Sequence, residues 1–233
     1  MSSLTVPSTS TIWSEASTAP GPLGVFGGTF DPVHLAHLRL AEEARDQLQL
    51  AAVRWIPAGQ PYHRETAPTA AQDRLAMVRL AVADHPAFTV DAAEVDSGQP
   101  SYTVPTLERL RTEIGPERPL VLLLGADAFA GIPGWHRWQE LFALAHLAVA
   151  HRPGYPLTTT ELPPVLAAEL EQRQADAAAV HQSPAGAIVP FAMTPLGVSA
   201  TRIRALLAAG NSVRYLLQPE VAAYIASHGL YAG

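Results

Sequence analysis

Short apolar runs alternate with segments of helical periodicity along most of this chain. The apolar runs are expected to form strands over residues 23–26, 52–57, 88–90, 119–125, 146–150 and 187–191. Segments with apolar residues three or four positions apart are expected to form helices over about 35–48, 71–83, 103–114, 135–144, 165–175, 199–210 and from about 219. This alternation predicts an α/β fold, a doubly wound, Rossmann-like, mainly parallel sheet with helices on both faces in a single domain.

The first residues have a different composition from the rest. Residues 1–22 are rich in Ser, Thr and Pro and contain one charged residue, Glu15. They have neither the arginines of a transit peptide nor the apolar core of a secretory signal. We therefore expect a flexible N-terminal tail over 1–22 and an α/β domain over 23–233.

Composition excludes several kinds of chemistry. The chain has no cysteine, which excludes disulfides and thiol nucleophiles. All 15 basic residues are arginines, so a P-loop lysine and Schiff-base chemistry are excluded as well.

The net charge is −6 and no basic stripe is present, so no nucleic-acid partner is expected. No apolar run approaches the roughly 20 residues of a membrane span, so we expect no membrane partner and a cytoplasmic location. Nothing in the sequence indicates an oligomeric state.

Polar and glycine residues follow five of the expected strands. They lie at 27–37, 58–64, 127, 151–152 and 199–204. The carboxyl ends of parallel strands meet at one edge of the sheet, where open α/β sheets bind their ligands. These segments are therefore expected to form one site.

The first of these segments has the features of a phosphate site. Gly27 and Gly28 allow a ligand close to the backbone, and His34 and His37 share one face at the start of a helix. Neither the dinucleotide fingerprint nor a P-loop is present. No third side chain has metal-ligand spacing nearby, so no protein metal site is predicted, and donation from the imidazoles to phosphate oxygens fits better.

A second phosphate site is expected at Ser199, Thr201 and Arg204, which form an S-x-T-x-x-R motif at a helix start. Hydroxyls and helix amides there would hold a phosphate, with Arg204 one turn along. The alternative is an N-cap serine followed by an exposed arginine. Trp135 is either a core residue or a platform for a flat ring.

These motifs make the sequence similar to the bacterial nicotinate-nucleotide adenylyltransferases, within the nucleotidyltransferase superfamily of the H-x-G-H and S-x-T-x-x-R motifs. The resemblance covers about residues 23–231. Its markers are GGTFDPVHLAHL (27–38), PAGQPYHR (57–64), SYTVPTL (101–107), GADAF (125–129), PGW (133–135), HRPGY (151–155), VSATRIR (198–204) and HGLY (228–231).

The resemblance implies transfer of AMP from ATP to nicotinate mononucleotide, with release of pyrophosphate and with Mg²⁺ accompanying ATP. It implies an ATP site formed by Gly27, Gly28, Thr29, Phe30, His34, His37, Gly125, Asp127, Ser199, Thr201 and Arg204. Of these, His34, His37 and Arg204 would act at the transferring phosphorus, and Asp127 would bind the ribose.

For the second substrate the resemblance implies His63, Arg64, Tyr102, Thr103, Trp135 and Arg152. The nicotinate ring would stack on Trp135, with its carboxylate at the amides around Tyr102 and Thr103. Arg152, His63 and Arg64 would hold the phosphate of the mononucleotide.

Two positions depart from the family pattern. Ala36 stands where the family has glycine, and its methyl group is expected close to the nucleotide. Tyr62 and Arg64 stand where many relatives have Pro and Lys. Three alternatives remain open at this point: a phosphopantetheine adenylyltransferase, an enzyme that accepts nicotinamide mononucleotide, and a nucleotide-binding sensor without turnover.

Overall fold

A computed structural model describes residues 21–61 and 69–232. Within this part of the chain, six parallel strands form one sheet in the order β3-β2-β1-β4-β5-β6, which is the doubly wound order that the sequence predicts. The strands are β1 (Leu23–Gly28), β2 (Ala52–Pro57), β3 (Phe88–Val90), β4 (Leu120–Gly125), β5 (His146–His151) and β6 (Ile188–Ala192). The predicted tail lies outside the described residues except for Gly21 and Pro22.

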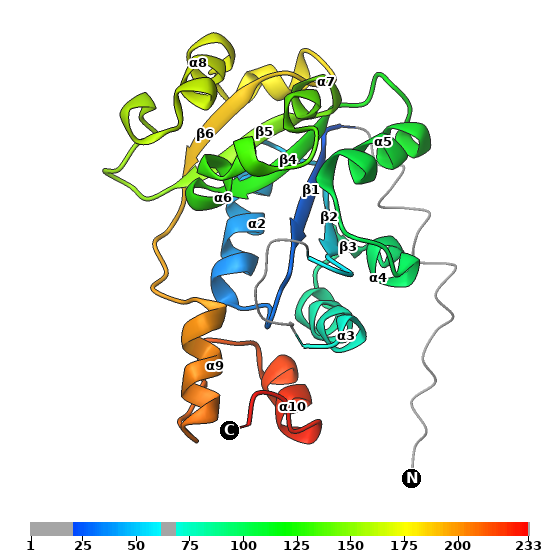
Figure 1. Ribbon diagram of the computed structural model, residues 1–233, viewed down its shortest axis with the longest axis vertical. Coiled ribbons are helices and arrows are strands. Elements are labelled where there is room, and N and C mark those ends of the chain that lie inside the picture. The colour runs from blue at the N-terminus through cyan, green and yellow to red at the C-terminus, as the bar shows by residue number, and fades with distance from the viewer. Residues whose placement is uncertain (1–20, 62–68, 233) are drawn as a thin grey trace.

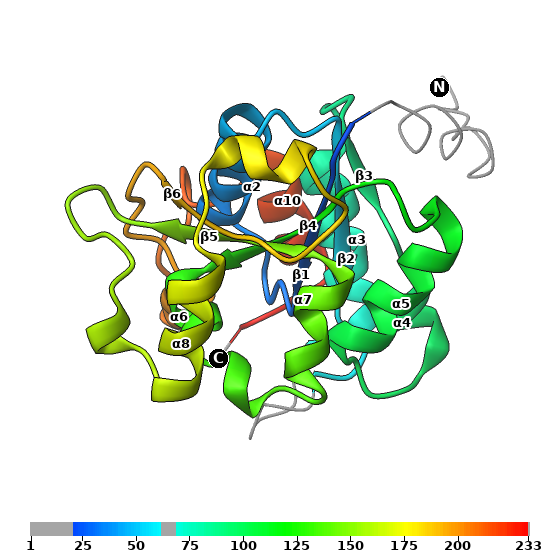
Figure 2. The same cartoon turned by 90° about the horizontal axis from the view of Figure 1, so that it is seen from above.

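Helices cover both faces of the sheet, as Figure 2 shows from above. One apolar core lies between the sheet and α2 (Leu35–Gln47), α3 (Ala71–Val82), α9 (Ala200–Ala208) and α10 (Pro219–Ser227). The other lies between the sheet and α5 (Thr103–Ile114), α7 (Leu141–Leu144) and α8 (Pro164–Arg173). Successive residues of β1 and β4 alternate between the two cores, because successive side chains of a strand point to opposite faces.

Most predicted elements agree with the structure to within one or two residues at their ends. The helix predicted over 135–144 was wrong: this stretch forms the 3₁₀ turn η2 (Trp138–Glu140) and α7. The chain is extended at Trp135 and left-handed at Arg137 (φ +58°), so a continuous helix cannot form there. Short elements were missed, namely α4 (Ala93–Ser97), α6 (Ala126–Ala130), η1 (Ile132–Gly134), η3 (Thr159–Glu161) and η4 (Ala177–His181).

The topology brings the predicted functional segments together. β1 and β4 are neighbours in the sheet although they are far apart in sequence, so the strand order reverses between them. Such a switch point leaves a crevice at the carboxyl ends of the strands. In Figure 1, α9 and α10 lie beyond this edge, at the bottom of the view.

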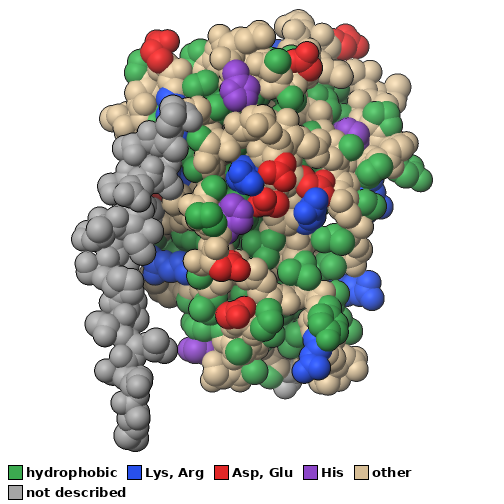
Figure 3. All heavy atoms as spheres, turned by 180° about the vertical axis from the view of Figure 1, so that it is seen from behind, with side chains coloured by type: hydrophobic (Ala, Val, Ile, Leu, Met, Phe, Trp, Pro, Cys, Tyr) green, Lys and Arg blue, Asp and Glu red, His purple; other side chains and the backbone are tan. Residues whose placement is uncertain are grey.

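The surface carries mixed charge. On the face shown in Figure 3, arginine side chains lie scattered among acidic ones. Among the ion pairs of the described residues, Arg45 on α2 contacts Glu42 at 3.2 Å and Asp46 at 3.0 Å. Among the described residues, no helix is both long and apolar enough to cross a membrane.

Candidate active site

Two cavities adjoin at the carboxyl edge of the sheet. The first, here called the histidine cavity, has a volume of about 600 Å³, and its walls include His34, His37, Asp127, Arg152 and Ser199. The second, here called the tryptophan cavity, has a volume of about 270 Å³, and its walls include Gly27, Gly28, Thr29, Thr103 and Trp135. Gly125, at the end of β4, lines both cavities. The site therefore offers two compartments at the switch point.

The histidine pair is built by the start of α2. His34 is the residue before the helix, and the rings of His34 and His37 stack with their centroids 3.7 Å apart. The edges of Phe26 and Phe30 meet His37 at ring distances of 6.0 and 5.2 Å. Aromatic packing therefore fixes the orientation of His37 before any ligand binds.

Burial favours the neutral form of both histidines. Burial lowers the pKa of His34 to about 4. Burial and the neighbouring His34 lower the pKa of His37 well below its usual value. The backbone N–H of His34 donates to Nδ1 of His37 (3.2 Å), so the neutral His37 ring carries its proton on Nε2. His37 is thus prepared as a hydrogen-bond donor.

His34 and Ala36 both line the histidine cavity. The Nδ1 atom of His34 is buried, and its side chain faces the backbone N–H of His37 in a capping box at the start of α2. This contact holds the His34 ring against the helix start.

The turn between β1 and α2 is held in place from the C-terminal part of the chain. Arg204 on α9 donates to the backbone oxygen of Asp31 (2.8 Å). The hydroxyl of Tyr231 donates to Oδ1 of Asp31 (2.7 Å), and burial raises the pKa of this tyrosine. The two predicted phosphate sites therefore lie against each other.

Ser199 has the local role of an N-cap. Its hydroxyl oxygen accepts a hydrogen bond from the backbone N–H of Arg202 (3.2 Å), and it also lies on the wall of the histidine cavity. Thr201 is exposed, and its hydroxyl accepts a long hydrogen bond from Arg204 (3.4 Å). The capping interpretation and the phosphate interpretation of this motif are therefore compatible.

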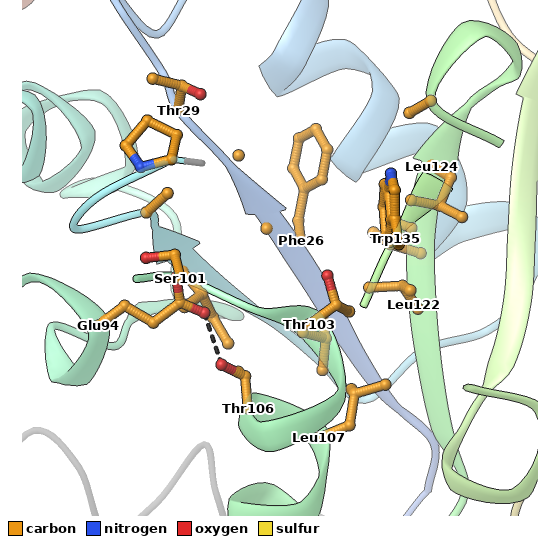
Figure 4. A pocket seen from close by; sticks show the side chains of 18 of the residues that line it. Phe26, Thr29, Glu94, Ser101, Thr103, Thr106, Leu107, Leu122, Leu124 and Trp135 are labelled. Carbon is orange, nitrogen blue, oxygen red and sulfur yellow. Dashed lines mark hydrogen bonds between the residues drawn. The ribbon is translucent and has the colours of Figure 1, made fainter. Parts of the chain in front are cut away.

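The tryptophan cavity has an apolar floor and a polar rim. Phe26, Leu122, Leu124 and Trp135 lie on one side of it in Figure 4. Trp135 packs against the α5 core and also lines the cavity, so its position is compatible with both interpretations of this residue. Tyr102 caps α5 and Thr103 is its first residue. The start of α5 therefore lies at this cavity, with Thr103 on its wall.

A carboxylate on this rim was missed by the sequence analysis. Glu94, on α4, accepts a hydrogen bond from the hydroxyl of Thr106 (2.6 Å; Figure 4). Burial raises the pKa of Glu94. Ser101 Oγ accepts from the backbone N–H of Gly59 (2.8 Å) and joins the second loop to the start of α5. A motif-based analysis could not find Glu94, because a lone carboxylate on a five-residue helix has no periodicity.

The predicted residues divide between the two cavities and the packing around them. Arg152, expected at the mononucleotide, lines the histidine cavity. Thr29, expected at ATP, lines the tryptophan cavity together with Gly27 and Gly28. The Phe30 side chain is buried behind the turn, where it packs on His37.

The remaining predicted residues of the second-substrate site are Tyr102, His63 and Arg64. The ring of Tyr102 lies beside His136, at a ring distance of 4.8 Å, and the residue lines a neighbouring groove. The predictions for His63 and Arg64 fall outside the described residues. Within the described part, no group of three or more His, Cys, Asp or Glu side chains is arranged to hold a metal ion.

Comparison with known proteins agrees with this geometry. The family model for cytidylyltransferase-like proteins matches residues 25–206. The chain is similar to the probable nicotinate-nucleotide adenylyltransferase of Dechloromonas aromatica (strain RCB), with 59% identity over 90% of this chain and 97% of that protein. It is also similar to the protein of the same description from Laribacter hongkongensis (strain HLHK9), with 51% identity over 90% and 94%.

A solved structure with the same fold supports the topology. It is the Plasmodium falciparum nicotinic acid mononucleotide adenylyltransferase complexed with NaAD, with a TM-score of 0.68 and 14% identity, covering 91% of this chain and 97% of that chain. At this identity the likeness concerns the fold. The sequence matches to the curated relatives go further, and the chain belongs to the nicotinate-nucleotide adenylyltransferases, within the cytidylyltransferase-like family.

Proposed function

We propose that this protein transfers AMP from ATP to nicotinate mononucleotide and releases pyrophosphate. It is a nucleotidyltransferase of NAD biosynthesis, as its membership of the family indicates. The observation that carries the proposal is the pair of adjoining cavities that share Gly125, because the reaction needs two nucleotides with their phosphates in contact. Since ATP is consumed, we place the reaction in the cytoplasm.

In our proposal ATP occupies the histidine cavity. Its triphosphate lies against His34, His37 and Ser199, which line that cavity. We propose that Thr201 and Arg204, which follow Ser199 on α9, add a hydroxyl and a positive charge. The neutral Nε2–H of His37 donates to the transferring phosphoryl group. A polyanion beside the imidazoles also raises their pKa values and so favours the charged form as charge develops in the transition state.

Asp127 supports the proposed place of the ribose. It is exposed at the first turn of α6, directly after Gly125, and lines the histidine cavity. A carboxylate at the end of a central strand is suited to accept hydrogen bonds from ribose hydroxyls. Gly27, Gly28 and Thr29 line the tryptophan cavity, and we propose that the backbone of residues 27–30 contacts ATP where the two nucleotides meet.

Nicotinate mononucleotide, in our proposal, occupies the tryptophan cavity. Its flat ring stacks on Trp135, and its carboxylate meets the amides at the start of α5, at Tyr102 and Thr103. Arg152 lies in the histidine cavity, at the side of Gly125 where the mononucleotide phosphate must reach ATP. His63 and Arg64 are proposed to hold the same phosphate. No residue forms a covalent intermediate, since the phosphate itself is the nucleophile.

Nucleotidyltransferases of this kind use ATP and typically a divalent metal, and we propose that the metal is Mg²⁺. Magnesium in nucleotide enzymes is bound largely by substrate phosphates and water, with one or two protein carboxylates at most. The wall of the histidine cavity has this character, with Asp127 as a carboxylate near the proposed nucleotide. When bound, Mg²⁺ would neutralise charge on the triphosphate.

Pyrophosphate release tests the proposed substrates. The purified protein is incubated with Mg-ATP and, in separate reactions, with nicotinate mononucleotide, nicotinamide mononucleotide or phosphopantetheine. We expect rapid release with the first, because helix amides favour a carboxylate over an amide. No release with nicotinate mononucleotide would refute the proposal, and equal rates with the first two would indicate a dual-specific enzyme.

A further inference from the structure

Arg74, on α3, is an arginine in the interior of the protein. Its side chain has no exposed surface. Its three guanidinium nitrogens donate to three backbone carbonyl oxygens: Nε to Thr69 (2.9 Å), Nη1 to Thr29 (2.7 Å) and Nη2 to Gly59 (2.9 Å). These oxygens belong to three segments that are separate in sequence. One planar group thus sets the spacing between the turn after β1, the loop after β2 and the start of α3.

Two of these segments form walls of the tryptophan cavity. Thr29 lines it from the first turn, and Ala58 and Pro61 line it on either side of Gly59. The loop is packed closely: a Cβ atom on Gly59 would lie 2.2 Å from the backbone oxygen of Glu94. The loop around Gly59 therefore cannot move toward α4 without a clash between backbone atoms.

The same loop is hydrogen-bonded to the residues that precede α5. The Gly59 N–H donates to Ser101 Oγ (2.8 Å), and the Ser101 N–H donates to the Gln60 backbone oxygen (3.0 Å). Gln60 Nε2 donates to the backbone oxygen of Gly98 (2.9 Å). Hydrogen bonds therefore connect Arg74 through residues 59–60 to Ser101, two residues before the first residue of α5.

The histidine cavity has other anchors. Its turn is held at Asp31 by Arg204 and Tyr231, and His37 is held by the rings of Phe26 and Phe30. Of the three carbonyl oxygens that Arg74 holds, that of Thr29 lies in this turn, whereas those of Gly59 and Thr69 belong to the loop after β2 and to the start of α3. A change at Arg74 should therefore affect the two cavities unequally.

We propose that Arg74 is a positioning residue that sets the width of the tryptophan cavity and so determines the affinity for the nicotinate nucleotide. The proposal rests on the function proposed above. Arg74 touches no substrate; it acts through the backbone of residues 29 and 59 and through Ser101. Lysine cannot replace it, because a single ammonium group cannot reach three carbonyl oxygens that a planar fork reaches together.

The test compares Arg74→Lys with Arg111→Lys in the full chain. Arg111 is a suitable control, since it also holds several backbone carbonyl oxygens, those of Leu144 (2.7 Å), Arg118 (2.6 Å), Pro184 (2.6 Å) and, at 3.4 Å, Pro116. These oxygens lie at the opposite, amino edge of the sheet. KM is measured by pyrophosphate release for nicotinate mononucleotide at saturating Mg-ATP, and for ATP at saturating mononucleotide. Thermal unfolding is followed by circular dichroism.

We expect Arg74→Lys to raise the KM for nicotinate mononucleotide by roughly tenfold or more and to change the KM for ATP by less than about threefold. Arg111→Lys should lower the unfolding temperature and leave both KM values within about twofold of wild type. If the two KM values rise together in Arg74→Lys, or if the two variants behave alike, the inference is wrong.

The remaining outcomes are also decisive. If Arg74→Lys does not fold, Arg74→Gln takes its place with the same expected split. If neither folds while Arg111→Lys does, Arg74 serves the fold and the inference is refuted. Absence of turnover in the wild-type protein would refute the proposed function itself, whereas normal wild-type turnover without the split would refute this inference alone.

Discussion

At the scale of single residues, His37 is fixed by contacts that do not depend on a ligand. It stacks on His34, meets the edges of Phe26 and Phe30, and accepts the N–H of His34 at Nδ1. Only Nε2 remains to interact with a bound group. A preorganised donor of this kind loses little free energy to reorganisation when charge develops on a phosphoryl group.

His37→Ala is therefore expected to lower kcat by about 10² to 10³, the effect of removing one preorganised donor. The KM for nicotinate mononucleotide should change little, because the tryptophan cavity does not include this side chain. Steady-state pyrophosphate release and thermal unfolding measure the two effects.

His85→Ala is the matched control. Its ring stacks on Phe88 at 3.7 Å and pairs with Glu42 at 2.8 Å, far in the fold from both cavities. The His85→Ala variant should keep the wild-type kcat, although it loses about as much packing as His37→Ala. A His37→Ala variant that retains most of its rate would contradict the role proposed for His37.

At the scale of elements, the loop after β2 has to fit between α3 and α4. Gly59 is the point of closest approach, since an added Cβ would come within 2.2 Å of the Glu94 oxygen and 2.8 Å of the Glu94 carbonyl carbon. Both are backbone atoms, which cannot turn away as a side chain can. A methyl group at this position must therefore move the loop or the helix.

Gly59→Ala is expected to lower the free energy of unfolding by about 1 to 3 kcal/mol through overpacking. It should also raise the KM for nicotinate mononucleotide, because the loop forms a wall of that cavity. Gly134→Ala serves as the control, since a Cβ there would meet no atom within 4 Å. Urea unfolding and the two KM values check the prediction, and equal stability of the two variants would contradict it.

The elements also show how far the sequence could predict the structure. The long apolar run at 120–125 and the repeated strand–helix alternation were sufficient for the parallel sheet and for the edge where the site lies. The sequence could not predict which side of the turn each residue faces. Thr29 lines the tryptophan cavity and Arg152 the histidine cavity, a division that the sequence does not specify because a strand end defines an edge and not a direction.

Arg74 was missed for a different reason, although a signal was present. It lies four residues before Val78 and so on the apolar face of its helix, where a cation needs partners. Its partners are backbone oxygens, which no side-chain pattern reveals. A charged residue on the buried face of a helix is therefore a candidate for hydrogen bonding to the backbone of neighbouring loops.

At the scale of the whole molecule, three buried histidines link the stability of the fold to pH. Burial lowers the pKa of His34 to about 4 and lowers the pKa values of His37 and His146. His146 lies at the start of β5, where its Nδ1 accepts from Ala187 N–H (3.1 Å) and Nε2 contacts the Ser183 oxygen (2.8 Å). In the unfolded chain each ring takes up a proton near pH 6.5.

The unfolded state therefore binds more protons than the folded state between about pH 6.5 and pH 4, and the free energy of unfolding falls as the pH falls through this range. His34 alone should account for roughly 2 kcal/mol between pH 7.5 and pH 5. Urea unfolding at these two pH values measures the change, and His34→Gln should reduce it. Equal stability at both values would contradict neutral, buried histidines.

The hydrogen bond between Tyr231 and Asp31 joins residues 200 positions apart. A ribosome adds roughly 5 to 20 residues per second, so about 10 to 40 seconds separate the synthesis of its two partners. During that interval a nascent chain already contains the turn that leads to the two histidines but lacks the tyrosine that holds its carboxylate. The part of the site that is made first is thus among the last to be completed.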